Sequence, residues 1–140
     1  MNQWELLQFG ISCVLFGIIW IIQIVHYPSF QSYDDSTFAE GMRNHQDRIS
    51  LVIIPFMLLE LFIAAYLCYT VPTVQNQTVM GIVICIWLCT FTIHVPLHRE
   101  LLLNGKNPQY IRRLVTTNWI RTILWTLKLF IVLSTTIHSL

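Results

Sequence analysis

The chain has 140 residues, of which 55% are hydrophobic and only 11% are charged. A soluble domain carries roughly a quarter charged residues, so this composition excludes an ordinary water-soluble protein and predicts an integral membrane protein embedded in the lipid bilayer. The formal net charge of +1 gives no reason to expect a nucleic acid as a partner. The four cysteines all fall inside apolar runs, where they are interpreted as small apolar residues rather than as a disulfide framework or as metal ligands.

The first predicted membrane helix covers residues 5–27. Its apolar run is long enough to cross about 30 Å of hydrocarbon, and Tyr27 at its end is typical of an interfacial anchor. Pro28 is expected to end the helix, because proline lacks the N–H that a continuing helix needs. Gln23 and His26, three residues apart, are expected to share one face of the last turn.

The second predicted helix covers residues 37–70. Thr37 and Glu40 form a capping-box pattern at its start. Pro55 lies near the beginning of the apolar run and is expected to kink the helix. Glu60 lies near the middle of the same run, where a carboxylate is costly and is usually either paired or functional.

The third predicted helix covers residues 78–103. His94 and His98 lie four residues apart near its end, so their imidazoles are neighbours on one helix face. Pro96 lies between them and cannot donate a hydrogen bond to the carbonyl of Thr92. The backbone hydrogen bonds are therefore expected to loosen beside the two histidines.

The fourth predicted helix covers residues 108–138. Asn118, Arg121 and Lys128 fall within one broad face at 100° per residue, and a polar face in a membrane helix should point into the bundle. Lys128 also lies at about the same depth as Glu60 of the second helix. A buried ion pair between these two residues is the simplest expectation.

The predicted fold is all-α: a single domain over residues 1–140 that forms an antiparallel, multi-pass four-helix bundle in the membrane. Four crossings bring four of the five histidines and most of the basic residues to one side, and leave His138 as the only histidine on the other. The positive-inside rule then places the histidine-rich end in the cytoplasm and both termini outside. A homo-oligomer is compatible with this architecture, but the sequence does not specify one.

The converging histidines predict a metal site at the end of the bundle. Its ligands would come from three helices: His26, His45, His94 and His98. A pair of imidazoles four residues apart can clamp one metal ion. Neutral imidazole suits several transition metals, so the ligand type leaves the choice of copper or iron open.

Three further polar residues are candidates for a catalytic role. Asn118 and Arg121 would orient ligands or substrate, and Glu60 would either stabilise the bundle or move protons. Two alternatives to a metal enzyme stay open. Two histidines on different helices, such as His26 and His94, could ligate a noncovalent haem b in an electron-transfer protein, or the chain could be a metal carrier or a membrane assembly subunit without enzyme activity.

Three segments resemble small four-helix membrane proteins that are grouped with the anthrone oxygenases. The sequence HVPLHREL at 94–101 is similar to that family's NVPLNxxL segment, and TNWIRT at 117–122 is similar to its Asn-x-x-Arg-Thr segment. QIVHYPSF at 23–30, with His45 downstream, more closely resembles an uncharacterised bacterial branch. The predicted arrangement of helices is similar over most of the chain, but the shared sequence motifs cover only about twenty residues.

This resemblance implies a bacterial inner-membrane protein with an oxidative activity on a hydrophobic, phenolic or quinone-like substrate that arrives from the bilayer. His94 and His98 stand where the family has asparagines, and anthrone oxygenases are regarded as needing no metal. The mechanism of that family is therefore not assigned to this protein. The leading prediction is a membrane-embedded oxidoreductase with a histidine-ligated copper or iron site, and the sequence alone leaves open whether the protein is an enzyme.

Overall fold

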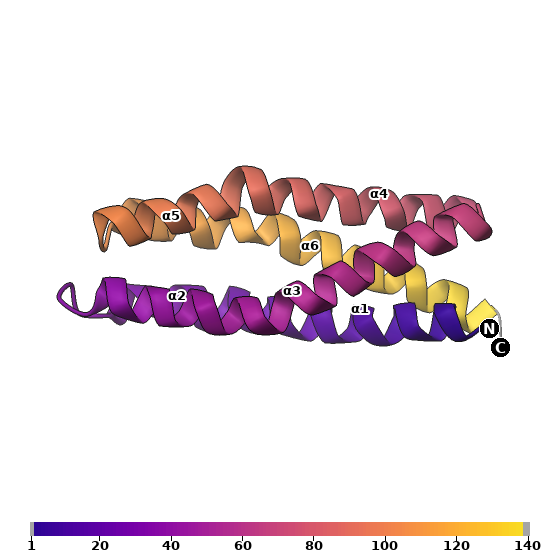
Figure 1. Ribbon diagram of the computed structural model, residues 1–140, viewed down its shortest axis with the longest axis horizontal. Helices are drawn as coiled ribbons and strands as arrows, with labels where there is room; N and C mark the ends of the chain where they lie inside the picture. The colour runs from indigo at the N-terminus through magenta and orange to yellow at the C-terminus, as the bar shows by residue number, and fades with distance from the viewer. Residues whose placement is uncertain (1, 139–140) are drawn as a thin grey trace.

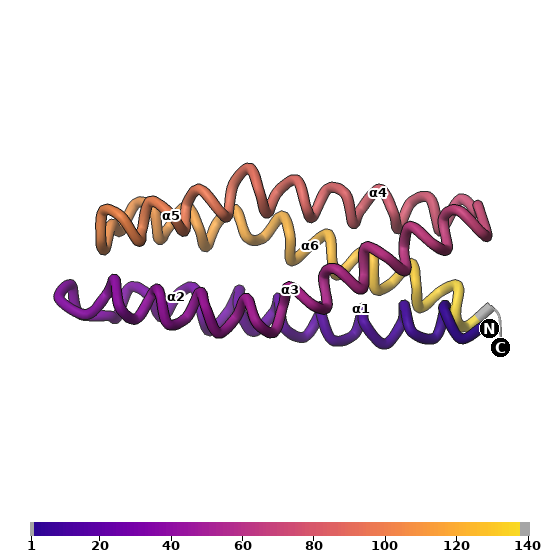
Figure 2. Tube along the Cα trace, viewed as in Figure 1, coloured from indigo at the N-terminus to yellow at the C-terminus, as the bar shows by residue number. Residues whose placement is uncertain are grey.

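A computed structural model describes residues 2–138, with side chains described up to residue 137, so the prediction about His138 lies outside the described side chains. Within this part of the chain, four helical segments are long and apolar enough to cross a membrane. They confirm the predicted four-helix architecture (Figure 1). The beginning of α1 and the end of α6 lie at one end of the bundle (Figure 2).

The first membrane segment continues through Pro28, so the prediction that this proline ends it is wrong. α1 (Gln3–Ile21) is followed without a break by a π-helical turn, η1 (Ile22–His26), then by α2 (Tyr27–Ser29) and a 3-10 turn, η2 (Phe30–Ser32). Pro28 falls in the first turn of α2. Proline is tolerated in a first turn, where its missing N–H costs little, and the wider turn before it relieves the clash of its ring with the carbonyl four residues earlier.

The second segment is α3 (Phe38–Thr70), which contains Pro55 in its interior. Figure 1 shows α3 changing direction along its length, from a path beside α1 to a crossing toward α4, as expected for a helix kinked at a proline. The predicted capping box is not formed, because the side chain of Thr37 makes no capping bond. Its hydroxyl instead donates to the carbonyl of Asp34.

The third segment also contains a π-helical turn. It consists of α4 (Val74–Cys89), η3 (Thr90–His94) and α5 (Val95–Asn104). The chain turns at Gly105, whose positive φ of 74° favours glycine, and the fourth segment is α6 (Pro108–His138).

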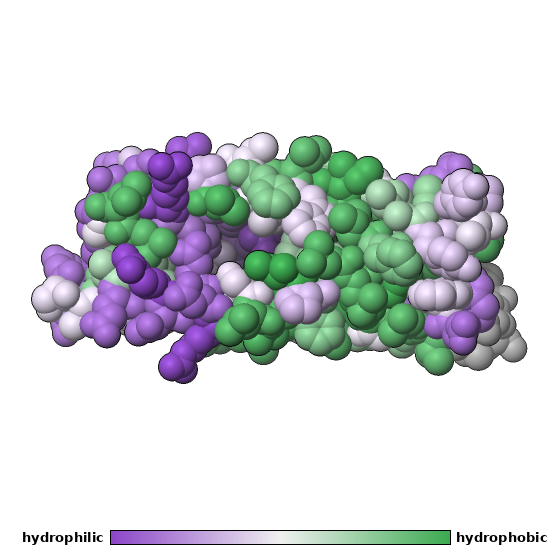
Figure 3. Space-filling view, in the orientation of Figure 1, coloured by the Kyte–Doolittle hydropathy of each residue, from purple (hydrophilic) through white to green (hydrophobic). Residues whose placement is uncertain are grey.

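The helices are longer than a bilayer requires. The four segments have 30 to 33 residues, which at 1.5 Å per residue gives about 45–50 Å, against about 30 Å of hydrocarbon. Figure 3 shows a hydrophobic band flanked by hydrophilic ends, and the hydrophilic region is the more extensive at the end that holds α2 and α5. The histidine-rich end of the bundle therefore extends beyond the hydrophobic band.

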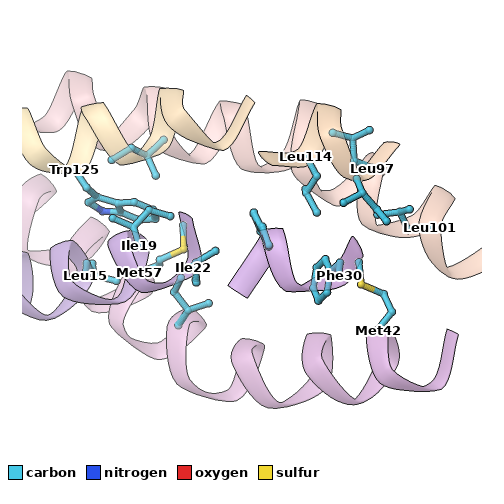
Figure 4. Close-up of a cluster of buried hydrophobic side chains, with 14 of the residues drawn as sticks. Leu15, Ile19, Ile22, Phe30, Met42, Met57, Leu97, Leu101, Leu114 and Trp125 are labelled. Atoms are coloured by element: carbon cyan, nitrogen blue, oxygen red, sulfur yellow. The ribbon is translucent and has the colours of Figure 1, made fainter. Parts of the chain in front are cut away.

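The main group of buried apolar side chains forms one cluster along the bundle axis (Figure 4). Trp125 lies with Leu15 and Ile19 at one end of this cluster. Phe30 and Leu101 lie at its other end. The polar residues of interest lie beside this cluster.

Candidate functional site

The two π-helical turns share one sequence pattern. η1 ends at His26 and η3 ends at His94, and a proline follows each histidine two residues later, at Pro28 and Pro96. The expected loosening of the helix at Pro96 is confirmed, and it takes the form of η3. Short π-helical turns occur frequently at functional sites, because the extra residue changes which side chains face the bundle.

η1 separates two residues that were expected to lie together. A π-helical turn holds more than 3.6 residues, so side chains three positions apart no longer share a face. The Gln23 amide nitrogen donates to the carbonyl of Val115 (3.1 Å), and its oxygen accepts from the Asn118 amide (2.8 Å). His26 instead packs against His45 of α3, with 3.6 Å between the ring centroids. The predicted common face of Gln23 and His26 is therefore wrong.

η3 fixes the hydrogen-bonding state of His94. Nδ1 of this buried side chain lies 3.1 Å from the carbonyl oxygen of Cys89. A carbonyl can only accept, so Nδ1 carries the proton, and a neutral ring then has its free lone pair on Nε2. Nε2 is buried and has no hydrogen-bond partner among the described residues. This geometry is the one that a histidine base or a histidine metal ligand requires.

A cavity of about 290 Å³ lies between α3 and the segment formed by η3 and α5. Its volume is at the lower end of the range of about 300–1,000 Å³ that is typical of small-molecule sites. Most of its wall is apolar: Ile22, Ile49, Ile53, Ile54, Met57, Phe91 and Val95. Ile54, Phe91 and Val95 are also about half exposed on the outer surface of the bundle, at 46%, 59% and 46%. The cavity therefore borders the surface that faces lipid.

Five elements contribute ionisable side chains to the cavity wall. They are Tyr27 of α2, His45 of α3, His94 of η3, His98 of α5 and Arg121 of α6. The Tyr27 hydroxyl lies 3.1 Å from His98 Nε2, and His98 Nδ1 is buried without a partner among the described residues. Tyr27 is only 4% exposed, so its predicted role as an interfacial anchor is wrong.

Arg121 brings a positive charge to this wall. Its guanidinium lies over the ring of Trp125, 5.2 Å from the centroid, and the side chain is only 5% exposed. Among the described residues it forms no ion pair, and its Nε has no hydrogen-bond partner. A buried cation without a counterion favours an anionic or strongly polar group beside it.

The structure brings the predicted site residues together only in part. His45, His94, His98 and Arg121 line the cavity, whereas His26 lies behind His45 and outside the cavity. Within the part of the chain that is described, no three His, Cys, Asp or Glu side chains are grouped closely enough to hold a metal ion. The four-histidine metal site therefore stays a prediction.

Asn118 and Glu60 lie apart from the cavity. Asn118 is fully buried in the hydrogen-bond network of Gln23. Glu60 forms the predicted ion pair with Lys128, which confirms that expectation. The Trp125 indole also donates to both carboxylate oxygens (3.2 Å each), and Lys128 donates to the Ser12 hydroxyl (2.8 Å).

Tyr27, Gln23 and Trp87 are site or network residues whose roles the sequence did not reveal. Trp87 lines the cavity, and its indole nitrogen is buried without a partner among the described residues.

No protein-family model matches the chain, and neither a curated protein nor a solved structure matches it. The resemblance to the anthrone-oxygenase group therefore stays a prediction.

Proposed function

We propose that the protein binds a small hydrophobic molecule with a phenolic hydroxyl in the cavity and acts on it as a membrane oxidoreductase of the oxygenase type. The observation that carries this proposal is the free Nε2 of His94, a buried proton acceptor on the wall of an apolar cavity that also contains the guanidinium of Arg121.

The chemistry follows from these two groups. The hydroxyl proton of the bound phenol passes to His94 Nε2, a buried acceptor without another partner among the described residues, and the positive charge of Arg121 favours this transfer. The electron pair stays on the phenolate oxygen, whose negative charge is stabilised by Arg121. An ionised phenol gives up electrons more readily than a neutral one. Dioxygen dissolved in the bilayer then forms a bond to a ring carbon: one of its oxygen atoms stays in the quinone product, and the other leaves as water with the two hydrogens that the phenol loses.

The cavity wall supports an apolar substrate that arrives from the membrane. Ile54, Phe91 and Val95 line the cavity and are also exposed on the surface that faces lipid. The volume of about 290 Å³ favours a molecule of one or two rings over a tetrapyrrole such as haem.

A direct test uses 1-naphthol as the probe and the full chain in lipid nanodiscs. Binding is followed by fluorescence, and the fraction of bound naphtholate is measured by absorbance. His94→Ala is expected to weaken binding about tenfold and to abolish the naphtholate signal, because a charged hydrogen bond is lost. His26→Ala is the matched control, since His26 lies outside the cavity. Equal effects of the two variants, or no binding by the wild type, would contradict the proposal.

A copper or iron ion is the second candidate, favoured by three buried imidazole nitrogens without partners. They belong to His26, His94 and His98. Since no three potential ligands are grouped among the described residues, η1 and the start of α3 would have to move toward η3 to complete such a site. Elemental analysis of the purified protein tests this candidate: bound metal that is lost in each of the four single histidine-to-alanine variants would support it. A Soret band in the absorbance spectrum would indicate haem instead.

A further inference from the structure

A second hollow lies on the outer surface of the bundle, between the end of α1 with η1 on one side and the first half of α3 on the other. This groove has a volume of about 350 Å³. Its apolar wall is formed by Ile18, Ile21, Ile22, Ile49 and Val52, and its polar end by His26, His45 and Arg48. The wall between the groove and the inner cavity includes Ile22, His45 and Ile49, because these residues line both. We propose that this groove binds one phospholipid with an anionic headgroup.

The position of Arg48 favours a lipid phosphate. Arg48 ends the charged run of α3, and the apolar run begins at Ile49, so the guanidinium lies at the level of the headgroups. Ile49 follows Arg48 directly, and Val52 lies one turn deeper into the membrane on the same face of α3. The groove therefore has a cationic end at headgroup depth and an apolar floor that continues where an acyl chain would lie.

The polar end of the groove lacks partners of its own. Among the described residues, Arg48 forms neither an ion pair nor a hydrogen bond. Nε2 of His26 is buried and also has no partner within that part of the chain. An anionic headgroup would supply a counterion for Arg48 and a polar partner for this nitrogen. A free phosphate ion would leave the apolar floor empty, so the whole surface fits a phospholipid better.

The test measures which lipid is retained by the full chain purified in detergent. Equal amounts of phosphatidylglycerol and phosphatidylcholine with the same acyl chains are added, and the lipid bound to the protein is quantified by mass spectrometry. The wild type is expected to retain phosphatidylglycerol about fivefold more than phosphatidylcholine. Arg48→Gln should abolish this preference and Arg48→Lys should keep it.

Two further variants separate the groove from general surface charge. Arg43→Gln is the matched control, because Arg43 is also exposed on α3 but does not line the groove. It should keep the preference. Val52→Trp should fill the apolar floor and release the lipid although Arg48 is intact. The proposal is overturned if both lipids are retained equally, if Arg43→Gln and Arg48→Gln act alike, or if Val52→Trp changes only the oligomeric state, which would indicate a second copy in the groove.

Discussion

The two buried polar clusters of this bundle differ in how completely their groups are paired. The ion-pair cluster (Ser12, Glu60, Trp125 and Lys128) joins three helices. Lys128 and the Trp125 indole donate to Glu60, Lys128 also donates to Ser12, and Ser12 donates to the carbonyl of Gln8. The cavity cluster (Tyr27, His45, His94, His98 and Arg121) leaves several nitrogens without partners among the described residues.

This difference in pairing indicates that one cluster stabilises the fold and that the other binds a ligand. A buried polar group without a partner lowers stability, so a protein gains nothing from it unless a ligand completes the bonds. The ion-pair cluster completes its own bonds and therefore holds the helices together. The cavity cluster has polar nitrogens without partners among the described residues on the wall of an apolar cavity, as a binding site requires. Substitutions in the first cluster should change stability, whereas those in the second should change binding.

The largest effect is expected for Lys128→Met. The substitution leaves the Glu60 carboxylate buried without its counterion, and breaking a buried ion pair in this way costs about 3–5 kcal/mol. The free energy of unfolding, measured by titration of detergent-solubilised protein with SDS, should fall by this amount. The double variant Glu60→Leu with Lys128→Met removes both charges and should recover most of the loss. A double variant as unstable as the single one would contradict this account.

Asn118→Leu should have the next largest effect. It removes the 2.8 Å donor to Gln23 and leaves the buried amide oxygen of Gln23 with only the more distant Thr122 hydroxyl, at 3.3 Å. A loss of about 1–3 kcal/mol is expected from this desolvated acceptor. Binding of 1-naphthol should be unchanged, because Asn118 does not line the cavity. A selective loss of binding with normal stability would instead support the predicted catalytic role of Asn118.

The sequence revealed the ion-pair cluster more fully than the cavity cluster, for a physical reason. Two opposite charges at the same depth in apolar helices are stable only as an ion pair. The ion pair between Glu60 and Lys128 could therefore be predicted from their positions in the apolar runs and from the helical rise per residue. Placing side chains around a helix assumes 3.6 residues per turn. η1 breaks that assumption, which is why Gln23 and His26 were wrongly put on one face.

The cavity itself could not be predicted. Periodicity indicates which side chains point into the bundle, but whether they fill the space depends on packing details that no sequence pattern encodes. The antiparallel topology correctly predicted that four of the histidines lie at the same end of the bundle. The burial of Tyr27 beside His98 depends on the first segment continuing past Pro28, which the proline rule argued against.

Tyr27→Phe should have a moderate effect on both properties. It removes the hydroxyl that lies 3.1 Å from His98 Nε2 and keeps the buried ring. Stability should fall by about 1 kcal/mol, the usual net value of one hydrogen bond. Naphthol binding should weaken less than in His94→Ala, since Tyr27 would orient His98 rather than accept the substrate proton. A parallel measurement on Tyr33→Phe, whose ring lies outside the cavity, serves as the control.

The smallest effect on stability is expected for Arg121→Met. This variant tests most directly whether the ion-pair cluster and the cavity cluster have different roles. Arg121 is buried without an ion pair among the described residues, and Met can fill similar volume against Trp125 at no cost in desolvated charge. The free energy of unfolding should therefore stay within about 1 kcal/mol of the wild type or rise. Naphtholate should no longer form in the cavity, because its counterion is gone. If Arg121→Met instead destabilised the bundle as strongly as Lys128→Met, both clusters would serve mainly to stabilise the fold. This result would contradict the proposal that the cavity is a binding site.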